Sequence, residues 1–334
     1  MNDELFMRRA LELAAQGRYS TSPNPMVGCV IVRDEQILAE GFHRRAGEAH
    51  AEVEALRNCG DPHGATMYVT LEPCSHQGRT PPCADAVIAS GVARVVVAMR
   101  DPHDVVDGRG IERIEAAGVA VTTGICEEEA RKLNERFVWS VTKKRPFVLL
   151  KAAMTLDGKL ATVTRDSRWI TADAARNRSL ELREEYDAIV VGGGTVATDD
   201  PHLTRRLGWS PTPWTRVILD RDRVVPAGAH VLTDGGATLH VTDDVDLERL
   251  LEDLYARGIH SLIVEGGSLL HSEFIVRKLW QKMIVFVAPA IVGGAEAPSI
   301  FSGEPVSRLT DAYRFRFDRA EMVGGDLMIT SYPR

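Results

Sequence analysis

The sequence lacks any apolar run long enough to cross a bilayer, which excludes a protein anchored by a membrane-spanning helix. Residues 1–4 are acidic and are not followed by the apolar region of a secretion signal. With 44% hydrophobic and 26% charged residues, the composition is that of a soluble globular protein. We therefore expect a cytoplasmic protein with no membrane partner.

An excess of positive charge is also missing. The chain carries 40 Lys and Arg against 47 Asp and Glu, a formal net charge of −7, and only 6% of its residues are aromatic. Proteins that bind nucleic acids need basic surfaces and aromatic stacking residues. The composition thus argues against a nucleic-acid partner, although a small anionic substrate needs only one or two local arginines.

The cysteines cannot all pair, because the chain has five of them, at positions 29, 59, 74, 83 and 126. An odd number in a chain without a secretion signal argues against a disulfide framework. We interpret Cys29, Cys59 and Cys126 as small buried hydrophobic residues.

A length of 334 residues favours two domains over one. Short β-branched runs alternate with apolar residues at helical spacing through the first part of the chain, which predicts an α/β sandwich. Residues 127–139 are predicted to be helical, and the basic stretch 142–146, which ends in proline, breaks the helix and is the candidate boundary. We expect domains at 1–144 and 145–334.

One imidazole and two thiols stand in an order that suits zinc. His50 comes first, and Cys74 and Cys83 follow, each directly after a proline. They can supply three ligands to one tetrahedral Zn²⁺ and leave its fourth position for water. Glu52, two residues after His50, is free to move a proton from that water to a leaving amine. This order of residues is the pattern of zinc deaminases that act on bases.

Two other interpretations share this motif. A non-catalytic zinc module should have a fourth protein ligand, and none stands at suitable spacing. A nucleic-acid base deaminase with an accessory domain conflicts with the acidic composition. Cytidine and transfer-RNA adenosine deaminases usually have two residues between the cysteines, whereas eight lie between Cys74 and Cys83. The insert carries Arg79, whose guanidinium suits a phosphate.

Glycine clusters follow two predicted strands in the second half. Residues 192–194 come after the run 188–191, and residues 266–267 come after the run 261–264 and before a helix at 269–278. Strand, glycines and helix form the layout of an anion-binding loop. Neither cluster is a Gly-x-Gly-x-x-Gly, so the Rossmann fingerprint is absent.

Several segments resemble the family of bifunctional riboflavin-biosynthesis enzymes. They are residues 23–29, 47–52 and 72–83 in the first half, and 150–158, 168–171, 195–204 and 264–267 in the second. That family deaminates 2,5-diamino-6-(5-phosphoribosylamino)pyrimidin-4-one and then reduces its ribosyl group to ribityl with NADPH. The resemblance implies an α/β protein, with a cytidine-deaminase-like α/β/α sandwich followed by a dihydrofolate-reductase-like α/β domain.

The resemblance also implies roles for residues of the deaminase half. His50, Cys74 and Cys83 would bind zinc, Glu52 would be the proton shuttle, and the substrate contacts would be Asn24, His43, His76, Arg79 and Asp101. Where the family reads Asp-Pro-Asn, this chain has Asp101-Pro102-His103. The contribution of the last position stays open, and with it the alternative that only one activity survives.

In the reductase half, Lys151 and Asp199 are implied to orient the ribose and assist proton transfer. The implied NADPH contacts are Ala153, Trp169, Thr171, Thr195, Asp199, Arg221, Gly267, Ser268, Leu269, Leu270, His271, Ser272 and Glu273. The implied substrate contacts are Ser167, Arg183, Leu203, Arg206 and Glu265. The partners would be small phosphoribosyl pyrimidines, and a homo-oligomer is left open.

Overall fold

The computed structural model describes residues 2–77, 81–103 and 107–334. The chain divides into two compact units, one made of Met1–Arg145 with Ser210–Thr212 and the other of Pro146–Trp209 with Pro213–Arg334. Among the described residues, no helix combines the length and the apolar character needed to cross a membrane.

The first unit is built on a five-stranded sheet in the order β2-β1-β3-β4-β5. β1 pairs antiparallel with β2 and β3, whereas β3, β4 and β5 are parallel. β1, β3 and β4 are buried along nearly their whole length, which explains their continuous apolar runs. The strands are β1 (Gly28–Arg33), β2 (Gln36–Phe42), β3 (Thr66–Leu71), β4 (Arg94–Met99) and β5 (Ala120–Thr123).

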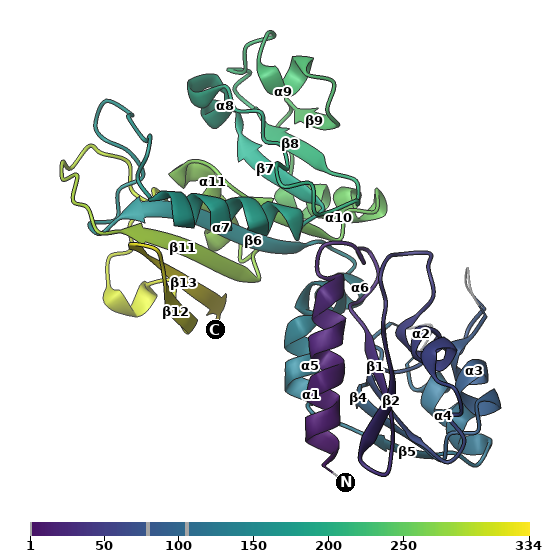
Figure 1. The fold of residues 1–334 in the computed structure, drawn as a ribbon. Coiled ribbons are helices and arrows are strands. Elements are labelled where there is room, and N and C mark those ends of the chain that lie inside the picture. Colours follow the sequence, from purple (N-terminus) through teal and green to yellow (C-terminus); the bar gives the residue numbers. More distant parts are fainter. Residues whose placement is uncertain (1, 78–80, 104–106) are drawn as a thin grey trace. The chain divides into compact units, whose positions relative to one another are not determined.

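Helices cover both faces of this sheet (Figure 1). One face is covered by α1 (Asp3–Ala14) and α5 (Glu127–Leu133), and the other by α2 (Ala51–Asn58), α3 (Cys83–Ala89) and α4 (Arg109–Ala116). The predicted α/β sandwich is therefore confirmed for this part of the chain.

The predicted helical stretch 127–139 is confirmed except at Asn134, where the helix is interrupted. Asn134 separates α5 from α6 (Glu135–Lys143), and its backbone, at φ −100° and ψ 22°, leaves the helical region. The Asn134 side chain is buried; its Oδ1 accepts from the Met26 N–H at 2.8 Å and its Nδ2 donates to the Met26 carbonyl at 2.8 Å. This long-range pair breaks the helix and fixes the loop before β1, which carries Asn24.

The second unit is built on an eight-stranded sheet in the order β12-β13-β11-β6-β10-β7-β8-β9. The strands from β11 to β9 are parallel, and β13 runs antiparallel to β11 and β12. Their bounds are β6 (Phe147–Thr155), β7 (Ala188–Gly192), β8 (Thr215–Leu219), β9 (Thr238–Val241), β10 (Ser261–Val264), β11 (Lys282–Ala288), β12 (Phe315–Val323) and β13 (Asp326–Pro333).

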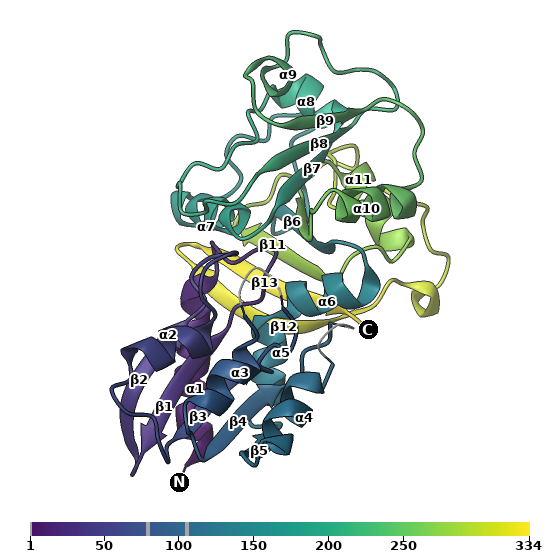
Figure 2. The same cartoon turned by 90° about the vertical axis from the view of Figure 1, so that its right-hand side faces the viewer.

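Helices lie on both faces of this second sheet (Figure 2). One face carries α7 (Asp173–Glu184) and the other α10 (Leu247–Ala256) and α11 (Ser268–Val276), while α8 (Gly193–Asp199) and α9 (His230–Thr233) are short. Because parallel strands end at the same edge of a sheet, the loops after β6, β7, β8 and β10 meet there, which is where α/β sheets place their ligands.

The close packing of α1 on β1 can be tested at Gly28, the first residue of β1. An added Cβ at Gly28 would lie 1.9 Å from the Ala10 carbonyl oxygen. We predict that Gly28→Ala lowers the free energy of unfolding by about 1–3 kcal/mol, because the backbone must shift to relieve the overlap. Chemical denaturation measures the change.

Gly60→Ala is the matched control, since a Cβ there meets nothing within 4 Å. It should change the free energy of unfolding by less than about 0.5 kcal/mol. Equal stability of the two variants would contradict the close contact between α1 and β1.

Candidate functional site

The three predicted zinc ligands come together in the first unit. His50 is the N-cap of α2, Cys74 follows β3, and Cys83 is the first residue of α3. The His50 Nδ1 lies 3.1 Å from the Cys83 Sγ and 3.6 Å from the Cys74 Sγ, and all three ligand atoms lie within 4.8 Å of one another. Zinc bond lengths in a tetrahedral site require nitrogen–sulfur separations of about 3.5 Å, so these residues fit the ion.

The two thiols differ in acidity. The pKa of Cys74 is lowered to about 4, chiefly because the Cys83 side chain hydrogen-bonds its sulfur, and His50 adds to the effect. The Cys83 backbone N–H also donates to the Cys74 Sγ, at 3.3 Å. The pKa of Cys83 is raised because its thiol gives its hydrogen bond to Cys74. The pKa of the Cys74 thiol is thus the lower of the two.

Glu52 lies on α2 beside these ligands, and only 3% of it is exposed. Burial raises the pKa of Glu52 to about 7, although the neighbouring His50 opposes the shift. A carboxyl group with a pKa near neutrality can both take up and release a proton under the same conditions. Its position and acidity therefore suit the predicted proton shuttle.

Asn24 and His43 form a neutral pair next to His50. The His43 Nδ1 lies 3.0 Å from the Ala49 carbonyl oxygen, and its Nε2 lies 3.0 Å from the Asn24 Nδ2. A carbonyl only accepts, so Nδ1 carries the proton and Nε2 accepts from the Asn24 amide. Burial lowers the pKa of His43, which favours this neutral ring. The His43 and His50 rings meet edge to face at 5.3 Å, which places the pair beside the metal ligands.

The other predicted contacts of this half lie in different settings. Asp101 is buried, and burial raises its pKa to about 6. His76 is exposed in the segment after Cys74. Arg79 lies outside the described residues. Sequence reasoning assigned no role to Glu72, a buried carboxylate just after β3, whose only signal was its place within the motif.

The second unit holds a cavity of about 790 Å³ at the carboxyl ends of its parallel strands. Glycine loops after β7 and β10 line it, and the N-cap residue of α11 is Gly267, which has no side chain to bond the first amides of that helix. Such a cradle fits a phosphate group of a dinucleotide. The predicted residues that line the cavity are Lys151, Ala153, Ser167, Thr195, Asp199, Arg221, Glu265, Gly267, Ser268, Leu269, Leu270 and Glu273.

The remaining predicted contacts of this half do not line the cavity, and their roles stay predictions. They are Trp169, Thr171, Arg183, Leu203, Arg206, His271 and Ser272. Trp169 is 71% exposed and stacks on the Arg176 guanidinium at 4.6 Å. Arg206 is exposed, whereas Thr171, Leu203, His271 and Ser272 are buried.

Glu265 joins two cations at the cavity wall. The Arg183 Nε and Nη2 donate to its two oxygens at 2.9 Å each, and the Lys151 Nζ lies 3.7 Å from Oε2. Burial would raise the pKa of Glu265, but Arg183 and then Lys151 outweigh it and hold the pKa at about 2. Burial lowers the pKa of Lys151, while Glu265 opposes that shift. The described partner of Lys151 is thus Glu265, and Asp199 lines the same cavity.

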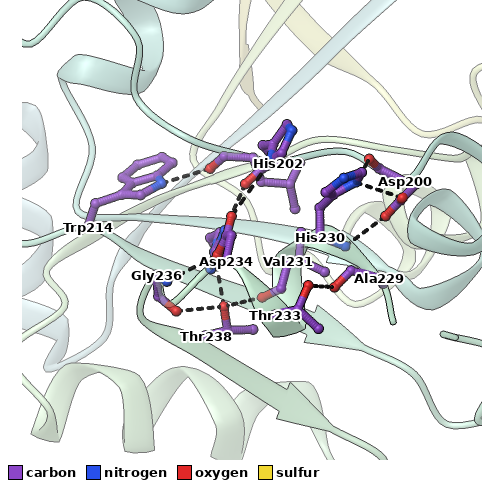
Figure 3. A network of polar contacts seen from close by, with 12 residues as sticks. Asp200, His202, Trp214, Ala229, His230, Val231, Thr233, Asp234, Gly236 and Thr238 are labelled. Atoms are coloured by element: carbon purple, nitrogen blue, oxygen red, sulfur yellow. Dashed lines mark hydrogen bonds and ion pairs between the residues drawn. The ribbon is translucent and has the colours of Figure 1, made fainter. Parts of the chain in front are cut away.

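A polar network fixes the segment that follows α8 (Figure 3). The buried Arg216 of β8 donates to both Asp234 oxygens at 2.7 Å and to the His202 carbonyl at 2.9 Å. Sequence reasoning missed this pair, because the two partners meet only once β8 and the residues after α9 are packed together.

Two further contacts complete this network. The Trp214 Nε1 donates to the Leu203 carbonyl at 2.8 Å, and Asp200 accepts from the His230 N–H at 2.9 Å. The His230 Nδ1 also lies 2.6 Å from an Asp200 oxygen. Three residues that follow Asp199, namely Asp200, His202 and Leu203, are therefore each hydrogen-bonded to a residue of another segment.

Known proteins match both units. The family described as cytidine and deoxycytidylate deaminase zinc-binding region matches residues 1–99, and the RibD C-terminal domain matches residues 146–329. The chain is 41% identical over 349 residues to the riboflavin biosynthesis protein RibD of Aquifex aeolicus, covering 98% of this chain and 97% of that protein. It is 40% identical over 365 residues to RibD of Escherichia coli K12, covering 98% and 99%.

Two solved structures match this chain, and each match covers 99% of this chain and 99% of the solved one. The diaminohydroxyphosphoribosylaminopyrimidine deaminase/5-amino-6-(5-phosphoribosylamino)uracil reductase of Thermotoga maritima has a TM-score of 0.91 at 40% identity. Form 1 of Acinetobacter baumannii RibD has a TM-score of 0.90 at 37% identity. Both expected domain folds are therefore confirmed.

The buried ion cluster around Glu265 should contribute to the stability of the fold. We expect Glu265→Gln to lower the free energy of unfolding by about 3–5 kcal/mol at pH 7, because it leaves Arg183 and Lys151 without a carboxylate. The folded pKa of about 2 lies below the ordinary 4.5, so the carboxylate stabilises the fold fully above about pH 4.5 and less as pH falls toward 2. Denaturant unfolding at pH 7 and at about pH 3.5 measures both effects.

Glu273→Gln is the control, because Glu273 pairs with Arg277 at 2.8 Å on an exposed helix face. Its cost should stay below about 1 kcal/mol. If Glu265→Gln lowers the free energy of unfolding as much at about pH 3.5 as at pH 7, the stabilising role of the Glu265 charge is contradicted.

Proposed function

This chain belongs to the RibD family of bifunctional riboflavin-biosynthesis enzymes, and on that premise we propose how it divides a deamination and a reduction between its two units. Residues 1–144 carry out the deamination with zinc, and residues 145–334 the reduction with NADPH. One observation carries this division: the metal ligands with Glu52 lie in the first unit, and the glycine-lined cavity with Lys151 lies in the second.

The substrates follow from the two activities for which the Thermotoga relative is named. The first unit acts on 2,5-diamino-6-(5-phosphoribosylamino)pyrimidin-4-one and releases ammonia. The second unit then reduces the ribosyl group of the deaminated product to ribityl. Full-length matches to proteins with both domains favour two activities over one, and the acidic composition disfavours a nucleic-acid substrate.

In the deaminase unit, His50, Cys74 and Cys83 would hold zinc. The bound ion lowers the pKa of a water molecule toward ~7 and so supplies a nucleophile at neutral pH. The Glu52 carboxylate takes a proton from the attacking water and delivers it to the departing amine, for which a pKa of about 7 suits both steps. Asn24, oriented by His43, and Asp101 hold the pyrimidine.

In the reductase unit, NADPH supplies a hydride when bound. The amides at the start of α11 and the glycines after β7 would hold its phosphates. The ribose ring must open before its C1 carbon can accept a hydride. The Lys151 ammonium, held by Glu265, donates a proton to the ring oxygen, and Asp199 orients the sugar from the same cavity.

We propose a cytoplasmic location and a homo-oligomer. A reducing compartment suits a zinc site with two thiolates and three further free cysteines. β12 is an edge strand that exposes 70% of Phe317 and 65% of Met322, and such an edge is a template for pairing with a second copy.

The role of Glu52 is tested by its isosteric amide. Glu52→Gln should bind one zinc per chain but release ammonia at least about 100-fold more slowly, because the amide cannot accept the proton. Ammonia assays and metal analysis of the same samples measure this. Glu54→Gln, two residues further along the same helix, should leave the rate unchanged. Full ammonia release by Glu52→Gln would exclude the proposed shuttle.

The role of Lys151 is tested by removing its ammonium. Lys151→Met should slow the loss of NADPH absorbance by roughly 100-fold or more, because no proton reaches the ribose. Deamination by the same variant is an internal control and should be retained. Normal NADPH consumption by Lys151→Met would rule out this assignment.

The oligomer is tested by placing a charge on the exposed edge. Phe317→Lys should shift the protein from an oligomer to a monomer in sedimentation experiments, since a buried unpaired cation disfavours association. A wild-type protein that sediments as a monomer at all concentrations would contradict this part of the proposal.

A further inference from the structure

The proposed mechanism does not use one buried carboxylate close in sequence to the metal ligands, that of Glu72. Glu72 directly follows β3 and precedes Cys74 by two residues, and only 3% of it is exposed. Among the described residues it has no ion pair with Lys or Arg. A carboxylate is buried without a cation only where hydrogen bonds replace its water.

Four backbone N–H groups supply these bonds. The Glu72 Oε1 accepts from Gly110 at 2.9 Å and Ile111 at 3.3 Å, and its Oε2 accepts from Asp101 at 3.2 Å and Gly108 at 3.0 Å. An ionised carboxylate is an acceptor only, with about four lone-pair sites, so donors from the chain fill its whole capacity.

On one side, Glu72 serves as the cap of α4. The N-cap residue Gly108 has no side chain, so it cannot bond the N–H groups of Gly110 and Ile111, as N-cap side chains usually do. Glu72 bonds both from a different element. A Cβ at Gly110 would lie 1.9 Å from the Pro73 carbonyl oxygen, so the start of α4 packs against the residue just before Cys74.

On the other side, Glu72 holds Asp101. The Asp101 N–H donates to Glu72, while its Oδ1 accepts from the His103 N–H at 2.9 Å, which fixes the side chain as well. Asp101 is only 8% exposed. Burial raises its pKa to about 6, and the charges of Glu72 and Cys74 add to the effect.

We propose that Glu72 is a positioning residue for the deaminase site and acts through Asp101. The proposal rests on the deaminase function above and deepens it. Glu72 ties Asp101 and the start of α4 to the backbone that carries Cys74, so the substrate contact and the metal ligand move as one body. In Glu72→Gln the amide nitrogen would face N–H donors, so bonds on one side of the clamp are lost.

The experiment is a double-mutant cycle on deamination by the full chain. Glu72→Gln should raise KM for the phosphoribosyl pyrimidine at least about tenfold, since small displacements of positioning groups have large effects. Zinc content should stay at one per chain and NADPH-dependent reduction should be unchanged. In the Asp101→Ala background the same substitution should change KM less than about twofold, because its route of action is gone.

Several outcomes would overturn the proposal. One is an effect of Glu72→Gln on KM that is equally large with and without Asp101. Another is an Asp101→Ala variant with wild-type KM. The third is loss of zinc from Glu72→Gln while the metal-loaded fraction keeps the wild-type KM. Glu112→Gln, at an exposed position of α4, is the control and should match the wild type. If the wild type itself releases no ammonia, the proposed function fails; if it does and the cycle is additive, only the role of Glu72 fails.

Discussion

The convergence of three ligand atoms is the constraint on which the first unit depends. An imidazole and two sulfurs from the start of α2, the loop after β3 and the start of α3 lie within 4.8 Å of one another. Nothing in a hydrophobic core favours such a cluster, since buried thiolates repel each other and lose hydration. A divalent cation reverses that cost, and the parallel strands with their covering helices bring the ligands to one edge.

In the second unit, buried charges are compensated by other side chains of the protein. Its cavity wall contains a carboxylate between a guanidinium and an ammonium, so the Lys151 charge is held at the cavity. Arg183 was expected to contact the substrate, yet its Nε and Nη2 donate to Glu265, and its Nη1 donates to the Thr204 carbonyl at 3.4 Å. In the described structure, Arg183 therefore acts on the site through Glu265, and its direct contact with substrate stays a prediction.

The sequence predicts those parts whose signals are local. The zinc ligands, the glycine clusters and the buried strands of both units can be found because residue type and spacing carry them. The break at Asn134 was missed because its cause, the pair with Met26, lies 108 positions away. Arg216 with Asp234 and Glu72 with α4 were missed for the same reason. Four strands were not predicted, namely β8, β9, β12 and β13, because short or exposed strands lack a clear hydrophobic period.

The central claim is that the first unit holds an open zinc site. Metal analysis combined with X-ray absorption at the zinc edge tests it most directly on the purified chain. We expect one zinc per chain, with two sulfur ligands, one imidazole nitrogen and a light atom from solvent. A chain that retains no zinc, or a zinc ion closed by four protein ligands, would contradict it.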